Sequence, residues 1–474
     1  NYNSNRNFSN SIMSKIEVDA IDKQSGSTLT IGGCGTTVQL GTGASQTGFG
    51  REGSVNWQTG SIKTAATFTA ASGEGYFVDT SSNQVTANLP AGSAGAIVAF
   101  SDYARNFNTN NLVITPNGSE KIGGVSASLR LTVDGQALTL VYVDSTKGWI
   151  NVQNAEDTEA AENFISASGG TEVTDGNFKL HVFTGPGTFT VSSLASTPSR
   201  NDVDYLVVGG GGGAGAQGGG GGAGGYRESP GSATCYTASP LGASPATAIT
   251  VTATGFPIAV GGGGAGSTTA PAQGVSGVNS SFSTITSAGG GGGGSDAYSP
   301  NKNGANGGSG GGGGWLPGPA PNNFGNGNTP SVTPSQGNNG GSGYPQANSH
   351  GGGGGGGAGG TGSDGETSKG GNGGVGTNTG IFGSAPQAPT YGTPGPAPGR
   401  YFAGGGGGNA NPGYSGGGTG GSGGGGNGAD PSGTVTNGSD NTGGGAGSKH
   451  NVYSSPYTNG NGGSGIVILR YKFQ

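Results

Sequence analysis

The residues that could carry chemistry are few, and their spacing favours no catalytic or metal-binding arrangement. The sequence holds three histidines, His181, His350 and His450, and two cysteines, Cys34 and Cys235. No Cys-x-x-Cys or Cys/His spacing joins them, so we expect neither a zinc site nor a disulfide framework. His181 lies in an alternating apolar segment, which is typical of a structural residue in a strand. Because no carboxylate pair or Ser/His/Asp set stands out either, we expect no enzyme activity, no metal and no cofactor.

Aromatic residues in loops point to binding instead. They are concentrated in stretches rich in Pro and Asn, such as WLPGPAPNNFGNGNTPSVTPSQ and KHNVYSSPYTNG. Aromatic rings bind sugar faces and apolar protein patches with little loss of conformational entropy. Local packing against proline is the alternative interpretation for each of them. The candidate contact residues are Trp315, Phe324, Tyr344, Phe382, Tyr391, Tyr401, Phe402, Tyr453 and Tyr457.

Composition argues against several other functions. Only 9% of the residues are charged and the net charge is −6, so the sequence lacks the excess of Lys and Arg that is typical of a nucleic-acid-binding protein. No run of about 18 apolar residues is present, and we expect no membrane insertion. Matches to G-x-G-x-x-G recur in the glycine runs, but none opens an amphipathic helix, so dinucleotide binding is not expected.

The chain divides into four segments. Residues 1–61 are polar and glycine-punctuated, and we expect a β stalk that buries its few apolar residues against copies of itself. Residues 62–153 contain eight β-type runs separated by turn signals, from ATFTA to GWINVQ, which predicts an antiparallel β-sandwich or jelly-roll-like module. Residues 154–176 include the one helix-favouring stretch and are interpreted as a linker. The remainder, residues 177–474, is dominated by glycine.

The glycine-rich segment begins and ends with apolar β-type sequence. Of the 115 glycines, 91 follow residue 208. The stretch NFKLHVFTGPGTFTVSSL predicts a hairpin over residues 178–191, DYLVV precedes the first glycine run, and GIVILRYKF follows the last. We expect these strands to pair as a small β cap on the glycine-rich part, with Leu206 to Val208 and Ile466 to Leu469 in one sheet.

The residues that interrupt the glycine runs recur mostly at multiples of three. Examples are Asn303, Asn306 and Ser309, and Ala214, Gln217 and Ala223. A flexible linker, the alternative interpretation, would show no such period. Three residues per turn is the period of the extended helix whose N–H and C=O groups all point outward. Such helices can hydrogen bond side by side as a polyglycine II bundle, in which outer helices carry Ala, Asn, Ser, Thr or Gln on their third face.

Several blocks of the chain together resemble a known group. DGNFKLHVFTGPGTFTVSS, VDYLVVGGGGGAG, NSSFSTITSAGGGGGG and GGSGIVILRYKFQ are similar to the glycine-rich domain of bacteriophage tail fibre proteins, especially those of marine phages. GYFVDTSSNQVTANLP and LVYVDSTKGW resemble a β-structured module of such fibres, and MSKIEVDAIDKQSGSTLTIGG resembles their N-terminal segment.

The resemblance implies a virion protein of the tail fibre or adhesin type that recognises a host surface glycan or outer-membrane protein through its loops. It also implies a homotrimer that attaches to other virion tail proteins through its N-terminus. The expected fold is mostly β with almost no α-helix: a stalk, a β-sandwich, and a β cap on a polyglycine II bundle. Two alternatives remain open, a structural glycine-rich filament or matrix protein and an enzyme acting on surface polysaccharide.

Overall fold

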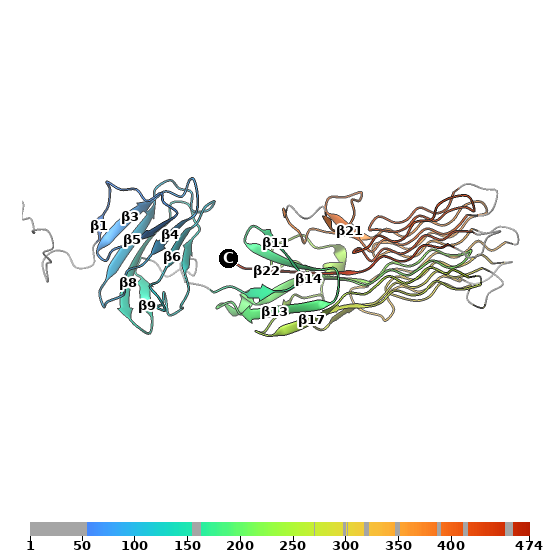
Figure 1. The fold of residues 1–474 in the computed structure, drawn as a ribbon, viewed down its shortest axis with the longest axis horizontal. Helices are drawn as coiled ribbons and strands as arrows, with labels where there is room; N and C mark the ends of the chain where they lie inside the picture. The colour runs from blue at the N-terminus through green and yellow to red at the C-terminus, as the bar shows by residue number, and fades with distance from the viewer. Residues whose placement is uncertain are drawn as a thin grey trace, which may run out of the picture.

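A computed structural model describes ten parts of the chain (Figure 1). They are residues 55–153, 163–269, 271–296, 300, 302–316, 322–346, 351–385, 390–410, 416–450 and 458–474. Strands and short 3₁₀ turns make up the regular structure of these parts, which confirms the mostly-β prediction. Within them, no helix has the length and apolar character needed to cross a membrane.

The first module contains all eight β-type runs that the sequence predicted, as strands of two sheets. One sheet has the order β1-β3-β5-β8-β9 and the other β2-β4-β6-β7. The two sheets enclose a single apolar core that includes Val98, Phe100, Leu138 and Trp149. The strands are β1 (Asn56–Trp57), β2 (Thr67–Thr69), β3 (Glu74–Val78), β4 (Val85–Asn88), β5 (Ile97–Asp102), β6 (Leu112–Thr115), β7 (Leu129–Leu131), β8 (Ala137–Asp144) and β9 (Gly148–Asn151).

The pairing inside this module differs from the antiparallel arrangement that we predicted. From β1 to β6 the chain alternates between the two sheets, so neighbours within one sheet are separated by a strand of the other. This coiling makes β1/β3, β3/β5, β2/β4 and β4/β6 parallel, and only the later pairs are antiparallel. The period-2 pattern of the sequence specifies a buried face but not the direction of the partner strand.

A second pair of sheets forms the β cap. One has the order β11-β12-β22-β14-β15, with β16 added beside β14, and the other β10-β13-β17-β18-β19. The strands are β10 (Ser166–Ser168), β11 (Thr171–Asp175), β12 (Phe178–Phe183), β13 (Gly187–Ser193), β14 (Asp202–Val208), β15 (Tyr226–Glu228), β16 (Ile249–Thr250), β17 (Gly255–Ala259), β18 (Ser280–Phe282), β19 (Ile285–Ser287) and β22 (Ile466–Lys472).

The predicted pairing of the two glycine-flanking strands is confirmed. Leu206 lies opposite Ile468 and Val208 opposite Ile466 in the antiparallel pair β14/β22, while β22 pairs with β12 on its other edge. The last strand of the chain is therefore central in its sheet. A central strand that contains IVIL is buried on both faces, as its unbroken apolar run indicates.

Two expectations for this region are wrong. β12 and β13 do not form a hairpin with each other, because the GPG turn carries the chain from one sheet into the other. The predicted linker also contains β10 and β11, which pair with β13 and β12. Loop composition marks where a strand ends, whereas the sheet that the next strand joins depends on long-range packing.

Beyond the cap the chain runs back and forth in extended glycine-rich segments (Figure 1). In the run 209–216, successive backbone N–H groups donate to three different neighbouring runs in strict rotation. Gly209, Gly212 and Gly215 donate to the run 219–225, Gly210, Gly213 and Ala216 to the run 272–278, and Gly211 and Ala214 to the run 460–463. The carbonyls of the same run accept from three further runs, at 264–267, 290–293 and 446. Backbone hydrogen bonds thus hold this run to six neighbours, where a globular core would use apolar side chains.

The close approach of these runs explains the glycine content. A Cβ on Gly211 would lie 1.9 Å from the carbonyl oxygen of Gly444, and one on Gly221 would lie 1.9 Å from that of Gly212. Ala214 and Ala223 nevertheless occur in these inner runs and are fully buried. The expectation that such in-phase alanines mark an outer face is therefore wrong for these two residues, since the lattice leaves room for a methyl group at selected inner positions.

Outer runs use side chains where a neighbouring main chain is missing. The side-chain oxygen of Asn339 accepts the N–H of Gly327 at 2.9 Å, and that of Asn427 accepts the N–H of Gly420 at 2.8 Å. Each such contact joins one outer run to the next. We call this set the side-chain belt, and its acceptors are Asn279, Asn306, Asn339, Asp364, Asn372, Asn427, Asn437, Asp440 and Asn461.

Candidate binding surfaces

The aromatic residues that we predicted as contacts lie at two opposite ends of the glycine bundle. Trp315, Phe324 and Tyr344 lie next to the described run ends at 316, 322 and 346. These runs end away from the cap, at what we call the far end (Figure 1). Four others lie beside the cap, on the segment that runs from β20 (Thr377–Thr379) to the end of β21 (Arg400–Phe402). These are Phe382, Tyr391, Tyr401 and Phe402. Tyr453 and Tyr457 lie outside the described residues.

At the far end a buried asparagine that we did not predict holds three runs together. Asn323 donates through Nδ2 to the carbonyls of Gly314 and Lys302 and accepts the N–H of Gly343 at 3.0 Å. Trp315 is buried next to Gly314, and Phe324 and Tyr344 are half-buried. These side chains therefore lie where the described runs reach the far end, and burial of Trp315 argues against its predicted contact role. Because NNF resembles any polar loop, only the three-dimensional contacts single out Asn323.

The far end carries an exposed polar surface around these residues. Described turns of the chain lie there at 216–218, 366–369 and 430–433. Other runs also reach this end. Their described residues stop there at 296, 316, 346, 410 and 450 and resume there at 302, 322, 351, 416 and 458. Its exposed described residues include Thr269, Pro271, Asn322, Pro345, Gln346, Glu366, Thr367, Lys369, Ser432 and Thr458.

The aromatic residues beside the cap are mostly structural. Phe382 and Phe402 are buried in the apolar cluster under the cap, together with Ile466 and Ile468. Tyr401 is also buried, and its hydroxyl accepts the N–H of Ala397 at 3.2 Å. For Phe382 and Phe402 burial overrides the predicted contact role, because a partner cannot reach them without unfolding the cap. Tyr401 is almost completely buried, although it borders an open cavity described below.

Tyr391, the fourth aromatic residue beside the cap, is half-buried. Its ring stacks on that of Phe382 at a centroid distance of 5.7 Å and an angle of 4°. This is the local loop packing that the alternative interpretation describes.

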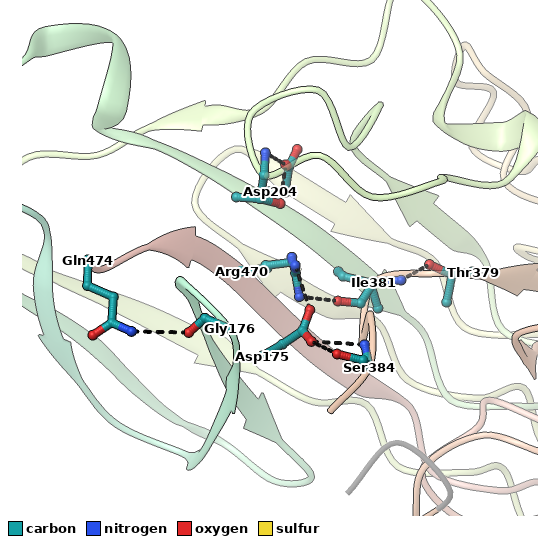
Figure 2. A network of polar contacts seen from close by, with 9 residues as sticks. Asp175, Gly176, Asp204, Thr379, Ile381, Ser384, Arg470 and Gln474 are labelled. Carbon is teal, nitrogen blue, oxygen red and sulfur yellow. Dashed lines mark hydrogen bonds and ion pairs between the residues drawn. The ribbon is translucent and has the colours of Figure 1, made fainter. Parts of the chain in front are cut away.

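An ion pair within the cap sheet forms hydrogen bonds with the segment that follows β20 (Figure 2). Arg470 of β22 and Asp175 of β11 are both buried, and Nη2 lies 2.8 Å from Oδ2. Ser384 donates to Asp175 through its N–H and its hydroxyl, and Arg470 Nη1 donates to the carbonyl of Ile381 at 3.1 Å. Burial alone would raise the pKa of Asp175, but the hydrogen bonds from Ser384 and Arg470 outweigh it and lower this pKa. The carboxylate is therefore charged at neutral pH.

Two further buried carboxylates attach the loop after β15 to the cap. Asp204 accepts from the hydroxyls of Ser229 and Thr234, both at 2.7 Å. Glu228 accepts from Thr379 Oγ1, from the Tyr226 hydroxyl at 2.8 Å and from the N–H of Ser239 at 2.9 Å. Burial raises the pKa of Glu228 above its ordinary value, although each of these donors lowers it.

The histidine that we predicted to be structural is buried between the two cap sheets. His181 Nδ1 lies 2.6 Å from the carbonyl oxygen of Gly169, so Nδ1 donates, and Nε2 faces the Tyr471 hydroxyl at 3.1 Å. Burial lowers the pKa of His181, which keeps the ring neutral at physiological pH. His450 is buried, and His350 lies outside the described residues.

The described ranges contain no group of three or more His, Cys, Asp or Glu residues placed to hold a metal ion. Cys235 is an exposed free thiol, while Cys34 lies outside these ranges.

Two open cavities flank the segment between β20 and β21. One, of about 440 Å³, is lined by residues that include Asp175, Asn177, Cys235, Tyr236 and Arg470. The other, of about 370 Å³, is lined by Leu241, Asn338, Val375, Tyr401 and their neighbours. Neither cavity was predicted, because each is formed by segments far apart in the chain.

Comparison with known proteins gives matches to two families. Residues 184–472 match the family described as "Glycine-rich domain", and residues 34–150 match "Bacteriophage T4 gp9/10-like protein, N-terminal". None of the curated proteins matches the chain. Because the first match covers more than half of the sequence, the chain belongs to the glycine-rich domain family. The second match, over residues 34–150, supports a phage tail protein.

Proposed function

We propose that this phage tail protein is a fibre adhesin whose far end binds a receptor on the host bacterial surface. In this proposal the glycine runs form a polyglycine II lattice that holds the loops at fixed positions. Residues 1–61 assemble three copies and attach them to other virion tail proteins. The protein acts without a catalytic step.

The arrangement of the glycine runs is the observation that supports this function. The runs start or end at one face away from the cap, so polar turns and run ends from many parts of the described sequence gather there. A rigid scaffold that displays irregular loops is the usual design of a recognition surface, because the scaffold lowers the entropy lost on binding. The receptor class that fits aromatic and amide side chains is a glycan or an outer-membrane protein.

The alternative function is a structural filament without specific binding. It requires the lattice to grow sideways by adding glycine runs of other copies. The side-chain belt opposes such growth, since its Asn and Asp oxygens already accept outer N–H groups that an added run would need. Electron microscopy of the purified protein tests this point: long polymers would favour the filament over the adhesin.

Competition for adsorption tests the adhesin proposal. We expect the purified chain to bind cells on which its phage forms plaques and to reduce adsorption of that phage. The double variant Gln346→Arg/Glu366→Lys changes two exposed far-end residues and is expected to lose this competition. Thr361→Lys is the matched control, because Thr361 is exposed on the same run as Glu366 but lies near the cap, and this variant should compete like the natural chain.

The outcomes separate the proposals. If the natural chain binds no such cells, and phage lacking it adsorb normally, the adhesin function is wrong. Release of reducing ends from host polysaccharide during the same incubation would instead indicate an enzyme.

A further inference from the structure

We propose that the 440 Å³ cavity beside Arg470 binds a neutral saccharide. We call it the cap cavity. Three segments far apart in the sequence form it: the β11–β12 turn with Gly176 and Asn177, the loop 235–237, and the loop that contains Gly380 and Gly383. It lies beside the cap and not at the far end, so the inference goes beyond the proposed function and does not depend on it.

Arg470 provides the observation that points to a ligand. Its side chain is 3% exposed, and its two terminal nitrogens are occupied by Asp175 and by the carbonyl of Ile381. Its Nε–H is buried and has no hydrogen-bond acceptor among the described residues. A buried donor without an acceptor costs about 1–3 kcal/mol, so an oxygen of a ligand in the cavity that Arg470 lines would relieve a real penalty.

The charges around the cavity select the kind of ligand. Arg470 is paired with Asp175 and lies directly opposite Asp204 in the β14/β22 register. Asp175 and Arg470 are the charged residues among those that line the cavity. One cation and one carboxylate balance, so neither a phosphate nor a metal ion would gain a net attraction.

The lining offers the groups that a sugar ring needs. The side-chain amide of Asn177 can donate to and accept from hydroxyl groups, and Tyr236 supplies an aromatic ring. The carbonyls of Gly176 and Gly380 each accept one hydrogen bond within the protein and have a second lone pair for a hydroxyl group. A volume of about 440 Å³ lies within the usual range of about 300–1,000 Å³ for small-molecule sites. Position 383 also requires glycine for a steric reason, because a Cβ there would lie 1.8 Å from Asp175 Oδ2.

Cys235 gives a direct readout for occupancy of the cap cavity. Its thiol is exposed and lines the cavity, so a bound saccharide should slow its alkylation. The experiment treats the full chain with N-ethylmaleimide and follows the Cys235 peptide by mass spectrometry, which separates it from Cys34. The probes are glucose, galactose, mannose and N-acetylglucosamine, with inorganic phosphate as the anionic comparison. We expect at least one sugar to slow the alkylation of Cys235 and phosphate to leave it unchanged.

Variants link that protection to the cavity. Cys235→Trp fills the cavity and should abolish binding of the protective sugar in ligand-observed NMR, whereas Val278→Trp, an exposed valine on the bundle flank, should not. Asn177→Ala should weaken binding by about three- to tenfold, the loss expected for one hydrogen-bonding group.

The inference is overturned if no sugar protects Cys235, if phosphate alone protects it, or if Cys235→Trp binds the sugar as well as the natural chain. Adsorption of the phage is a separate measurement, so its outcome leaves this test unaffected.

Discussion

At the scale of single residues, glycine in this protein is a packing residue. In the inner runs each Cβ that is missing makes room for the carbonyl of a neighbour, as at Gly211 against Gly444. The free energy lost by ordering glycine is offset by backbone hydrogen bonds that are protected from water. Glycine has no such role at an outward-facing position such as Gly262, which has nothing within 4 Å of its Cβ position.

Two glycine-to-alanine variants test this distinction. Gly211→Ala is expected to lower the free energy of unfolding by about 1–3 kcal/mol, because the new methyl forces two runs apart. Gly262→Ala, the matched control, should change it by less than about 0.5 kcal/mol, as exposed substitutions usually do. Chemical denaturation of both variants measures the difference. Equal stability of the two would show that inner glycines are not required for close approach.

At the scale of elements, the outer runs need side chains as well as glycine. An outer N–H has no main-chain acceptor on its open side, and the side-chain belt supplies one from the adjacent run. This explains why Asn recurs at the third position of several runs. The period of three in the sequence therefore has two causes. Side chains recur where the lattice has room for a Cβ, and Asn or Asp recurs where an outer N–H needs an acceptor.

Substitution at Asn339 tests the belt. Asn339→Ala removes the acceptor for Gly327 and is expected to lower stability by about 0.5–1.5 kcal/mol, the usual contribution of one hydrogen bond. Asn339→Asp keeps an acceptor oxygen and should lose less. Thermal unfolding of the two variants compares them directly. An aspartate variant no more stable than the alanine variant would contradict the acceptor role.

At the scale of the whole molecule, two kinds of core hold the chain. The first module has a conventional apolar core of its own. The cap has apolar clusters on both faces of its β14/β22 sheet, and one of them continues onto Ala223, Ala358 and Ala403 of the glycine runs. Cap and bundle therefore form one cooperative unit, while the module forms another.

Unfolding of the full chain should accordingly show two transitions. Leu138→Ala, in the module core, is expected to destabilise only one of them by about 2–5 kcal/mol, and Ile468→Ala, in the cap, only the other. Calorimetry of the two variants assigns each transition. A shift of both transitions by either variant would mean that the two units do not unfold independently.

The sequence by itself determined the local features of this protein. Alternation of apolar residues predicted all eight strands of the first module, and the apolar runs DYLVV and GIVIL predicted the central pair of the cap. The recurrence of Asn, Ser and Thr at multiples of three predicted extended runs held by backbone hydrogen bonds. These features depend on neighbours close in the chain, which is why they could be predicted.

Only the tertiary structure decided the rest. It set the parallel pairing of β3 and β5, the separation of β12 from β13 into facing sheets, and the burial of Phe402 under the cap. It also brought Asp175, Cys235 and Arg470 to one cavity. A strand has the same period of two whichever partner it takes, and an aromatic residue beside proline has the same sequence whether it is buried or exposed. Such features follow from contacts between distant segments, and a local pattern does not contain them.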